Sequence, residues 1–291
     1  MDKKRILVTG AGGQLGSELR LIAPAYADLT CTFADSHTLD VTDRQAVMAY
    51  VRTYPADCII NCAAYTAVDR AEDDLAACHR VNALAPGILA EAAEHVGASL
   101  LHVSTDYVFD GLTYRPYVET DATRPQTVYG RTKLEGERRV LEGCSRAMIV
   151  RTSWLYSLRG RNFLTTMLRL GRERTDLGVV ADQVGTPTWV RDLAECLLTV
   201  IRRGIVPGTY HFSNEGVCSW FDFARAIHRL SGITTCRLVP LHTEEYPTRA
   251  LRPHYSVLDK TKLKQTYGLD MIPHWADSLE ACLRTLNTQE R

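Results

Sequence analysis

The chain has 291 residues, enough for one large domain or two closely packed ones with a sizeable core. Its formal net charge of zero gives no reason to expect nucleic acid or a membrane surface as the main partner. Hydrophobic residues make up 45% of the chain and charged residues 23%, as in ordinary globular proteins. No apolar run approaches the roughly 20 residues of a membrane helix. A charged N-terminus leads directly into a strand, so we expect no signal peptide and a cytoplasmic location.

The N-terminal segment predicts a strand, a glycine-rich turn and a helix. The apolar run Arg5–Thr9 precedes the turn, and Leu15, Leu19 and Ile22 give the following segment an amphipathic pattern. Glycines let such a turn approach a pyrophosphate closely, and the helix N-terminus offers it free N–H groups. We therefore predict that a dinucleotide binds at Gly10, Gly13, Gln14, Leu15 and Gly16.

Strand and helix patterns alternate through the next 140 or so residues. The predicted strands are Leu29–Phe33, Cys58–Asn61, Leu100–Ser104 and Ala147–Arg151. The predicted helices are 42–53, which a capping box of Thr42 and Gln45 opens, Asn82–Val96, which Gly97 ends, and 128–142. This alternation is typical of an α/β fold with a doubly wound parallel sheet of Rossmann type.

Beyond about residue 152, prolines and glycines interrupt the pattern, and we predict a smaller, mainly helical lobe that binds substrate. Its helices are expected at 162–172, 189–201 and 220–231. The predicted division is a dinucleotide-binding domain over 1–155, to which part of 172–203 can belong, and a substrate-binding lobe that makes up most of 156–291.

Tyr129 and Lys133 are four residues apart, so a helix places both side chains on one face. A nearby ammonium favours the phenolate and lowers the pKa of a tyrosine from its usual value of about 10. Such a tyrosine can act as general acid toward a carbonyl that is being reduced, and Thr105, at the end of a predicted strand, can hydrogen-bond the same oxygen. The alternatives are a surface tyrosine with a solvated lysine, and a threonine that only caps the strand.

Five stretches carry a family resemblance, and they run in the family's order through most of the chain. They are Asn-Cys-Ala-Ala-Tyr-Thr-Ala-Val-Asp at 61–69, Ser-Thr-Asp-Tyr-Val-Phe-Asp-Gly at 104–111, Tyr-Gly-Arg-Thr-Lys-Leu-Glu-Gly-Glu at 129–137, Arg-Thr-Ser-Trp at 151–154 and Asp-Gln-Val-Gly-Thr-Pro-Thr at 182–188. The chain resembles the extended short-chain dehydrogenase/reductases that act on nucleotide sugars, and among them the dTDP-4-dehydrorhamnose reductases most.

The resemblance implies hydride transfer from NADH or NADPH to C4 of dTDP-4-dehydro-L-rhamnose. It makes Thr105, Tyr129 and Lys133 the catalytic residues, with Tyr129 protonating the new alkoxide. Lys133 is expected to lower the pKa of Tyr129 and, like Tyr129, to contact the cofactor, through the nicotinamide ribose. The nucleotide sugar is the expected partner.

Further cofactor contacts can be assigned on the nucleotide side. Asp35 follows the second predicted strand, where a carboxylate binds a ribose 2′-hydroxyl and favours NADH, although the choice between NADH and NADPH stays open. By resemblance, Asp40 and Val41 contact the adenine, and the small side chains of Ala63 and Ala64 leave room for the cofactor. Close packing of a helix on the sheet is the alternative reason for these alanines.

The substrate contacts rest on the resemblance. Thr66 and Val68 match positions that line the sugar pocket, with Asp106 and Tyr107 beside Thr105. Trp154 is expected to stack on the deoxysugar, or else to belong to the core. Asn162 would reach toward the diphosphate. Arg252 would bind a phosphate or hold the lobe in place through an ion pair.

Tyr107 separates the possible reactions. Dehydratases of this family carry a glutamate there as the base for water elimination, so we expect reduction instead. An epimerase, another reductase of 4-keto-deoxysugar nucleotides, and a non-catalytic regulatory subunit like that of methionine adenosyltransferase remain alternatives.

Metal binding is not expected. Nine cysteines include no Cys-x-x-Cys pair, and most lie in apolar stretches as reduced core residues. Some bacterial members of the family dimerise around magnesium, but here Arg191 lies where acidic ligands are needed, beside Asp192 and Glu195 alone. We therefore expect no interface metal, and a monomer or a weak homodimer.

Overall fold

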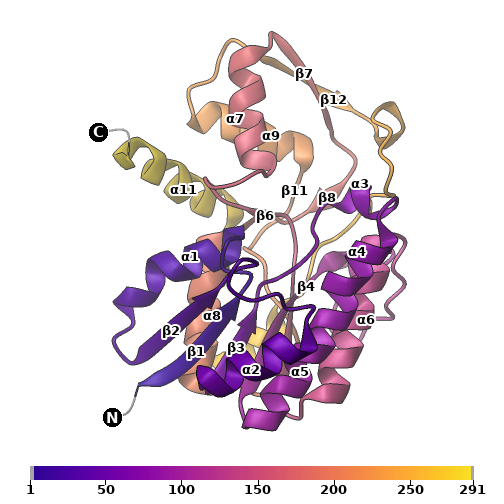
Figure 1. Ribbon diagram of the computed structural model, residues 1–291. Helices are drawn as coiled ribbons and strands as arrows, with labels where there is room; N and C mark the ends of the chain where they lie inside the picture. Colours follow the sequence, from indigo (N-terminus) through magenta and orange to yellow (C-terminus); the bar gives the residue numbers. More distant parts are fainter. Residues whose placement is uncertain (1–2, 290–291) are drawn as a thin grey trace.

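The computed structural model describes residues 3–289, and its centre is a six-stranded sheet (Figure 1). The strands are β1 (Lys4–Thr9), β2 (Leu29–Ala34), β3 (Cys58–Asn61), β4 (Ser99–Thr105), β5 (Ala147–Thr152) and β10 (Gly208–His211). They lie in the order β10-β5-β4-β3-β1-β2, and every neighbouring pair is parallel. The order reverses between β1 and β3, where doubly wound sheets bind their ligands.

Helices cover both faces of this sheet. The helices of one face are α1 (Gln14–Ile22) and α8 (Val190–Arg203), and those of the other are α2 (Arg44–Thr53), α5 (Ala85–Val96) and α6 (Val128–Gly143). β1 shows why the strands are apolar throughout: Ile6 and Val8 pack toward α1 and α8, while Leu7 packs toward α2 and α5. Strands buried on both faces are expected in a parallel sheet. The predicted fold class is confirmed.

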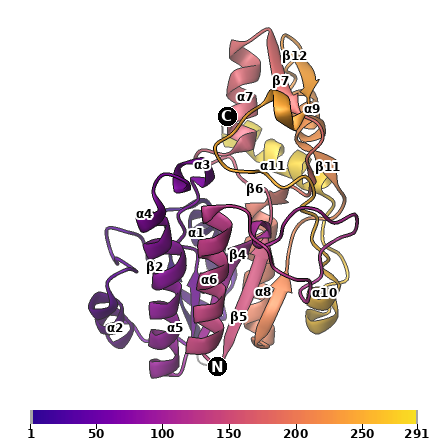
Figure 2. The same cartoon turned by 90° about the vertical axis from the view of Figure 1, so that its right-hand side faces the viewer.

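A second layer of structure, here called the upper lobe, lies above the carboxyl ends of the strands in both views (Figures 1 and 2). Its helices are α7 (Phe163–Glu173), α9 (Trp220–Leu230) and α11 (Trp275–Gln289). Its short strand pairs are β7 (Asp176–Val180) with β12 (Arg237–Leu241), β8 (Val184–Gly185) with β11 (Cys218–Ser219), and β6 (Leu155–Tyr156) with β9 (Thr188–Trp189). The lobe has a core of its own around Phe223 and Leu279.

Shorter elements connect these layers. They are the helices α3 (Val68–Ala71), α4 (Leu75–His79) and α10 (Thr261–Tyr267), the π-helical turn η2 (Arg80–Leu84), and the 3₁₀ turns η1 (Ala23–Ala25), η3 (Asp106–Val108) and η4 (Thr243–Glu245). After the upper lobe begins, the chain returns to the sheet through α8 and β10, whose side chains share the core of β1. The predicted domain boundary at residue 155 stays a prediction. Within residues 3–289, no helix is long and apolar enough to cross a membrane.

Two predicted helix starts were wrong in detail. Asp43, and not Thr42, caps α2, because its carboxylate accepts bonds from the Gln45 and Ala46 N–H groups. The helix predicted from Asn82 is regular only from Ala85, after the wider turn η2, with a proline in its first turn. Pro86 has no N–H to donate to that turn. As predicted, Gly97 ends the helix, with a φ of +71°.

The close approach of α6 to η2 requires glycine at position 136. A Cβ there would lie 2.1 Å from the Asn82 carbonyl oxygen. We expect Gly136→Ala to lower the free energy of unfolding by about 1 kcal/mol, because overpacking (about 1–3 kcal/mol) outweighs alanine's helix propensity (about 1 kcal/mol). Urea denaturation measures the change. Gly12→Ala is the control, since its Cβ would meet only Asp35 Cβ, at 3.7 Å. Equal stability of the two variants would contradict the close approach.

Candidate active site

The glycine-rich turn after β1 lies against the end of β3. Gly10 has a φ of +67°, and a Cβ there would lie 2.4 Å from the Ala63 backbone nitrogen. A Cβ on Gly16 would lie 2.5 Å from Ala11 Cα. Neither position has room for a larger residue, so the turn is held tightly between the sheet and α1.

α1 begins at this turn without a side-chain cap. Gly13 is its N-cap residue, and Gln14 and Leu15 are the first residues of the helix. Backbone N–H groups in a first turn have no intrahelical partner, and the helix dipole favours an anion beside them. The turn therefore meets the physical requirements of a pyrophosphate site.

The upper lobe contacts this turn directly. Gln14 Oε1 accepts hydrogen bonds from Ser157 Oγ and Asn162 Nδ2, each at 2.9 Å. Asn162 is also the N-cap of α7, where its side chain accepts a bond from the Thr165 N–H. Asn162 thus connects the turn to the upper lobe, and its predicted contact with the diphosphate stays a prediction.

Asp35 lies beside the glycine-rich turn, as its contact distance to Gly12 shows. Its Oδ1 accepts bonds from the Thr38 hydroxyl and from the backbone N–H groups of His37 and Thr38. The Thr38 hydroxyl is the main reason that the pKa of Asp35 is lowered. Asp35 is therefore a fixed carboxylate at the edge where a ribose would lie.

The remaining predicted cofactor residues follow the ends of β2 and β3. Asp40 accepts bonds from the backbone and hydroxyl of Thr42, which lower its pKa. Val41 is buried and Ala64 is half-buried. Because parallel strands end at one edge of the sheet, these residues share an edge with the glycine-rich turn.

Tyr129 lies in the first turn of α6, next to the end of β4. The ring of Tyr107 meets it edge-on, with 5.4 Å between the ring centroids, and Val68 and Cys78 belong to the same apolar cluster. Burial raises the pKa of Tyr129, and the nearby Thr105 hydroxyl acts in the opposite direction. Tyr129 is thus a buried phenol that holds its proton, with Thr105 as its polar neighbour.

The pKa of Tyr129 is raised and not lowered, because burial is the largest influence on it. The effect expected of Lys133 on that pKa stays a prediction. Lys133 is 1% exposed, and its Nζ donates to the Val103 carbonyl at 2.7 Å. The Nζ group is therefore held by β4, and burial dominates the pKa of the phenol. Burial also lowers the pKa of Lys133 itself, to about 8.

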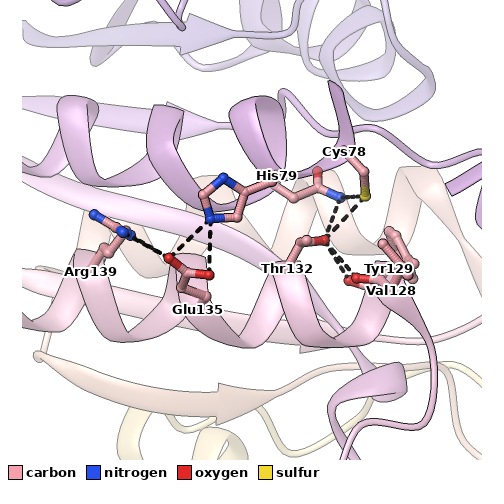
Figure 3. A network of polar contacts seen from close by, with 8 residues as sticks. Cys78, His79, Val128, Tyr129, Thr132, Glu135 and Arg139 are labelled. Atoms are coloured by element: carbon pink, nitrogen blue, oxygen red, sulfur yellow. Dashed lines mark hydrogen bonds and ion pairs between the residues drawn. The ribbon is translucent and has the colours of Figure 1, made fainter. Parts of the chain in front are cut away.

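α6 is fixed to α4 on the side shown in Figure 3. Thr132 donates to the carbonyl oxygens of Val128 and Tyr129, and its hydroxyl lies 3.2 Å from Cys78 Sγ. One turn further along, Glu135 binds both His79 and Arg139. These contacts hold the turn of α6 that carries Tyr129.

Arg252, in the segment between β12 and α10, contacts Tyr107. Its Nη1 donates to Tyr107 Oη at 2.8 Å, and its Nη2 donates to Asp69 Oδ2 at 2.5 Å. Asp69 also accepts a bond from the Ala250 N–H, at 3.1 Å. The ion pair, one of the two roles expected of Arg252, is therefore present, and phosphate binding stays a prediction.

Thr66 and Trp154 differ in their surroundings. Thr66 is exposed at the start of the segment that leads to α3. Trp154 stacks on Trp220, with 3.5 Å between the ring centroids and 7° between the planes, and its φ is +47°. A non-glycine residue in this region is strained, and such strain concentrates at functional sites. One indole face is covered by Trp220, and stacking on a sugar stays a prediction.

No group of three or more His, Cys, Asp or Glu side chains that could hold a metal ion occurs among residues 3–289. Asp192, one of the carboxylates considered for such a role, instead accepts bonds from Asn214 and Ser278. Glu195 is exposed on α8.

Three polar residues were not assigned from the sequence although the structure places them at the site. Asp69 holds Arg252, while Asn61 and His102 form a buried chain that ends at Lys133. A signal was present in Asn61 and His102, because a polar residue inside a buried strand needs a hydrogen-bond partner.

Residues 4–288 match the protein family described as the RmlD substrate binding domain. The chain belongs to this family. A relative from Burkholderia thailandensis, named dTDP-4-dehydrorhamnose reductase, is 40% identical over 98% of this chain and 100% of its own length. The family assignment confirms the resemblance seen in the five sequence stretches.

Solved structures from the same family have nearly the same fold. A dTDP-4-dehydrorhamnose reductase from Clostridium acetobutylicum gives a TM-score of 0.93 at 43% identity, covering 97% of this chain and 99% of that one. The Bacillus anthracis dTDP-4-dehydrorhamnose reductase in complex with NADP gives 0.93 at 39% identity, with the same coverage.

Asp106, beside Thr105, gives the site a testable pH dependence. It is 3% exposed, and burial raises its pKa from 3.8 to about 6. The folded state then binds more protons than the unfolded state between these values, so this carboxyl lowers the stability as pH rises through about 4 to 6. The shift corresponds to about 3 kcal/mol.

We expect the stability of Asp106→Asn, relative to the wild type, to increase by about 2 kcal/mol between pH 4 and pH 7. Urea denaturation at several pH values measures it. Asp176→Asn is the control, because Arg237 lowers the pKa of this exposed carboxyl. Its stability relative to the wild type should therefore change with pH in the opposite direction. A difference between Asp106→Asn and the wild type that does not change with pH would contradict the raised pKa.

Proposed function

We propose that this protein reduces the C4 keto group of dTDP-4-dehydro-L-rhamnose to give dTDP-L-rhamnose, with NADPH or NADH as the reductant. The observation that carries the proposal is a buried, protonated Tyr129 beside Thr105, at the edge where the glycine-rich turn ends. The names of the relatives, each about 40% identical over nearly the whole chain, support the same reaction.

The glycine-rich turn fits a dinucleotide. Gly10 and Gly16 leave no room for side chains, and the uncapped N-terminus of α1 offers its N–H groups at Gln14 and Leu15. Asp35 supplies a carboxylate for the adenosine ribose. When bound there, the reduced nicotinamide supplies the hydride. NADP is bound in the Bacillus anthracis relative, which supports NADPH as one of the two reductants.

Tyr129 is assigned the proton transfer. A phenol is protonated at neutral pH even at its usual pKa of about 10, and burial raises the pKa of Tyr129 further, so Tyr129 can donate a proton to an alkoxide that forms at the sugar C4. Thr105 orients the carbonyl oxygen by a hydrogen bond. Lys133 binds the nicotinamide ribose from its place between α6 and β4.

The sugar nucleotide would lie between the sheet and the upper lobe. Asp106 and Tyr107 extend the edge that carries Thr105, and Thr66 and Val68 border it at the start of α3. Trp154, Asn162 and Arg252 are the contacts from later in the chain.

We also infer that the protein is cytoplasmic and is a monomer or a weak homodimer without an interface metal. No nucleic acid or membrane is needed as a partner. Sedimentation with and without EDTA tests the oligomer, and an EDTA-sensitive dimer would contradict this inference.

Tyr129→Phe should lower turnover by about 10²–10⁴-fold, the usual contribution of a general acid, while cofactor binding stays near normal. The ring remains and only the proton donor is lost. NADPH oxidation with dTDP-4-dehydro-L-rhamnose measures turnover, and fluorescence titration measures binding. Tyr114→Phe, at a 93% exposed phenol, is the control and should keep full activity. Near-normal turnover of Tyr129→Phe would refute its role.

The wild type should not convert dTDP-glucose to a 4-keto-6-deoxy product, because Tyr107 occupies the position where the dehydratases carry a basic glutamate. The protein is incubated with dTDP-glucose and NAD⁺, and the absorbance of the keto product in alkali is measured. The positive control is NADPH oxidation by dTDP-4-dehydro-L-rhamnose. Formation of the keto product would identify a dehydratase, and inactivity with every 4-keto sugar nucleotide would favour a regulatory subunit.

A further inference from the structure

A row of buried polar side chains crosses three strands and ends at Lys133. Thr9, Asn61 and His102 are paired in register on β1, β3 and β4. Thr9 Oγ1 donates to Asn61 Oδ1 at 2.9 Å, Asn61 Nδ2 lies 2.9 Å from His102 Nδ1, and His102 Nε2 lies 3.3 Å from Lys133 Nζ. All four residues are at most 1% exposed, so water cannot substitute for these partners.

The backbone of Ala63 fixes the direction of this chain. Its N–H can only donate, and it points at Asn61 Oδ1 over 3.0 Å. The amide oxygen of Asn61 must therefore face Ala63 and Thr9, which leaves the amide nitrogen facing His102. That nitrogen donates, so His102 Nδ1 is the acceptor and carries no hydrogen.

His102 is neutral, because complete burial lowers its pKa well below the usual value. A neutral imidazole carries one N–H, and Nδ1 has none, so the hydrogen is on Nε2. This N–H points at the Nζ of Lys133.

An ammonium has three donors and no lone pair. In that form, Lys133 would place a donor N–H group against the donor N–H group of His102, with no acceptor between them. The neutral amine has a lone pair that accepts from His102 Nε2–H while it still donates to the Val103 carbonyl. The geometry points to His102 as a positioning residue, whose Nε2–H holds the Nζ of Lys133 and favours the neutral amine.

The other titratable groups around Lys133 act differently. Glu137, Cys62 and Cys78 favour the ammonium, but the charge of Glu137 is already bound by two hydrogen bonds from Arg151. None of them forms a hydrogen bond with Nζ among the described contacts. Tyr129, one turn before Lys133, remains protonated. His102 is therefore the side chain in contact with Nζ that distinguishes its two protonation states.

The inference concerns the residue that the proposed function assigns to the nicotinamide ribose, and so it rests on that proposal. Because burial lowers the pKa of Lys133 to about 8, this lysine can release and take up a proton close to neutral pH. The state of His102 and Lys133 can still be measured without turnover, so failure of the proposed activity and failure of this inference are distinguishable.

The first test is the tautomer of His102 in the wild type, read from the ¹⁵N shifts of its ring nitrogens. The signals are assigned by their loss in His102→Gln, and His95→Gln, at an exposed histidine, is the control. We expect hydrogen on Nε2 and no protonation between pH 6 and 9. Hydrogen on Nδ1, or an imidazolium at pH 6, would overturn the inference.

The second test reverses the chain with Asn61→Asp. A carboxylate still accepts from Ala63 and Thr9, but it also accepts from His102, so hydrogen moves to Nδ1 and the lone pair of Nε2 faces Lys133. The ammonium is then favoured, and the titration midpoint of Lys133 should rise by at least about one pH unit. The ¹³Cε shift of Lys133, assigned by its loss in Lys133→Met, measures the midpoint.

The two readouts separate this effect from that of the added charge. A switched tautomer together with a raised midpoint supports the inference. A raised midpoint with the tautomer unchanged reflects charge alone and overturns it, as does a switched tautomer with an unchanged midpoint. In the reductase assay, the pH–rate profile of Asn61→Asp should move by the same amount as the midpoint. If Asn61→Asp does not fold, the tautomer of His102 in the wild type decides the inference: hydrogen on Nε2 supports it and hydrogen on Nδ1 overturns it.

Discussion

The complete burial of Lys133 between α6 and β4 is the constraint on which the rest of the site depends. A polar amino group removed from water is costly unless hydrogen bonds replace its solvation, so α6 must bring Nζ within reach of the Val103 carbonyl. Glycines make that approach possible: a Cβ on Gly130 would lie 2.2 Å from the Tyr107 carbonyl oxygen. The same approach buries Tyr129, which keeps its proton. The positions of the acid and of the lysine are thus two results of one packing requirement.

Contacts from later in the chain meet this edge of the sheet at two separate places. At the glycine-rich turn, Asn162 reaches Gln14, and at the start of α3, Arg252 reaches Asp69 and Tyr107. Arg252 is largely buried, and its pKa is raised although burial itself acts to lower it, because Tyr107 and Asp69 surround it. Both links hold polar groups at the edge of the sheet that is proposed to bind the sugar nucleotide.

The sequence predicted most of the fold because its patterns are local. The strands buried on both faces, such as Cys58–Asn61, were located to within about one residue, and the glycine-rich turn lies between β1 and α1 as predicted. What failed depends on three-dimensional contacts. The spacing of Tyr129 and Lys133 put both on one side of α6, but it could not show that β4 supplies the partner of Nζ. The cap of α2 was missed for a smaller reason, since Thr42 and Asp43 are both good capping residues and only the backbone direction separates them.

Asn61 shows most clearly why the missing part could not be read from the sequence. Its two hydrogen-bond partners, Thr9 and His102, come from different strands. The strand of Thr9 ends 52 residues before Asn61 and that of His102 begins 38 residues after it, so only the sheet register aligns the three side chains. A shift of one residue in either pairing would turn the partner side chain to the other face of the sheet. The same amide oxygen that orients His102 also holds Ala63, whose backbone lies against Gly10. The register of three strands therefore sets both the shape of the glycine-rich turn and the hydrogen-bond direction at Lys133, which couples the two halves of the proposed cofactor site through one buried side chain.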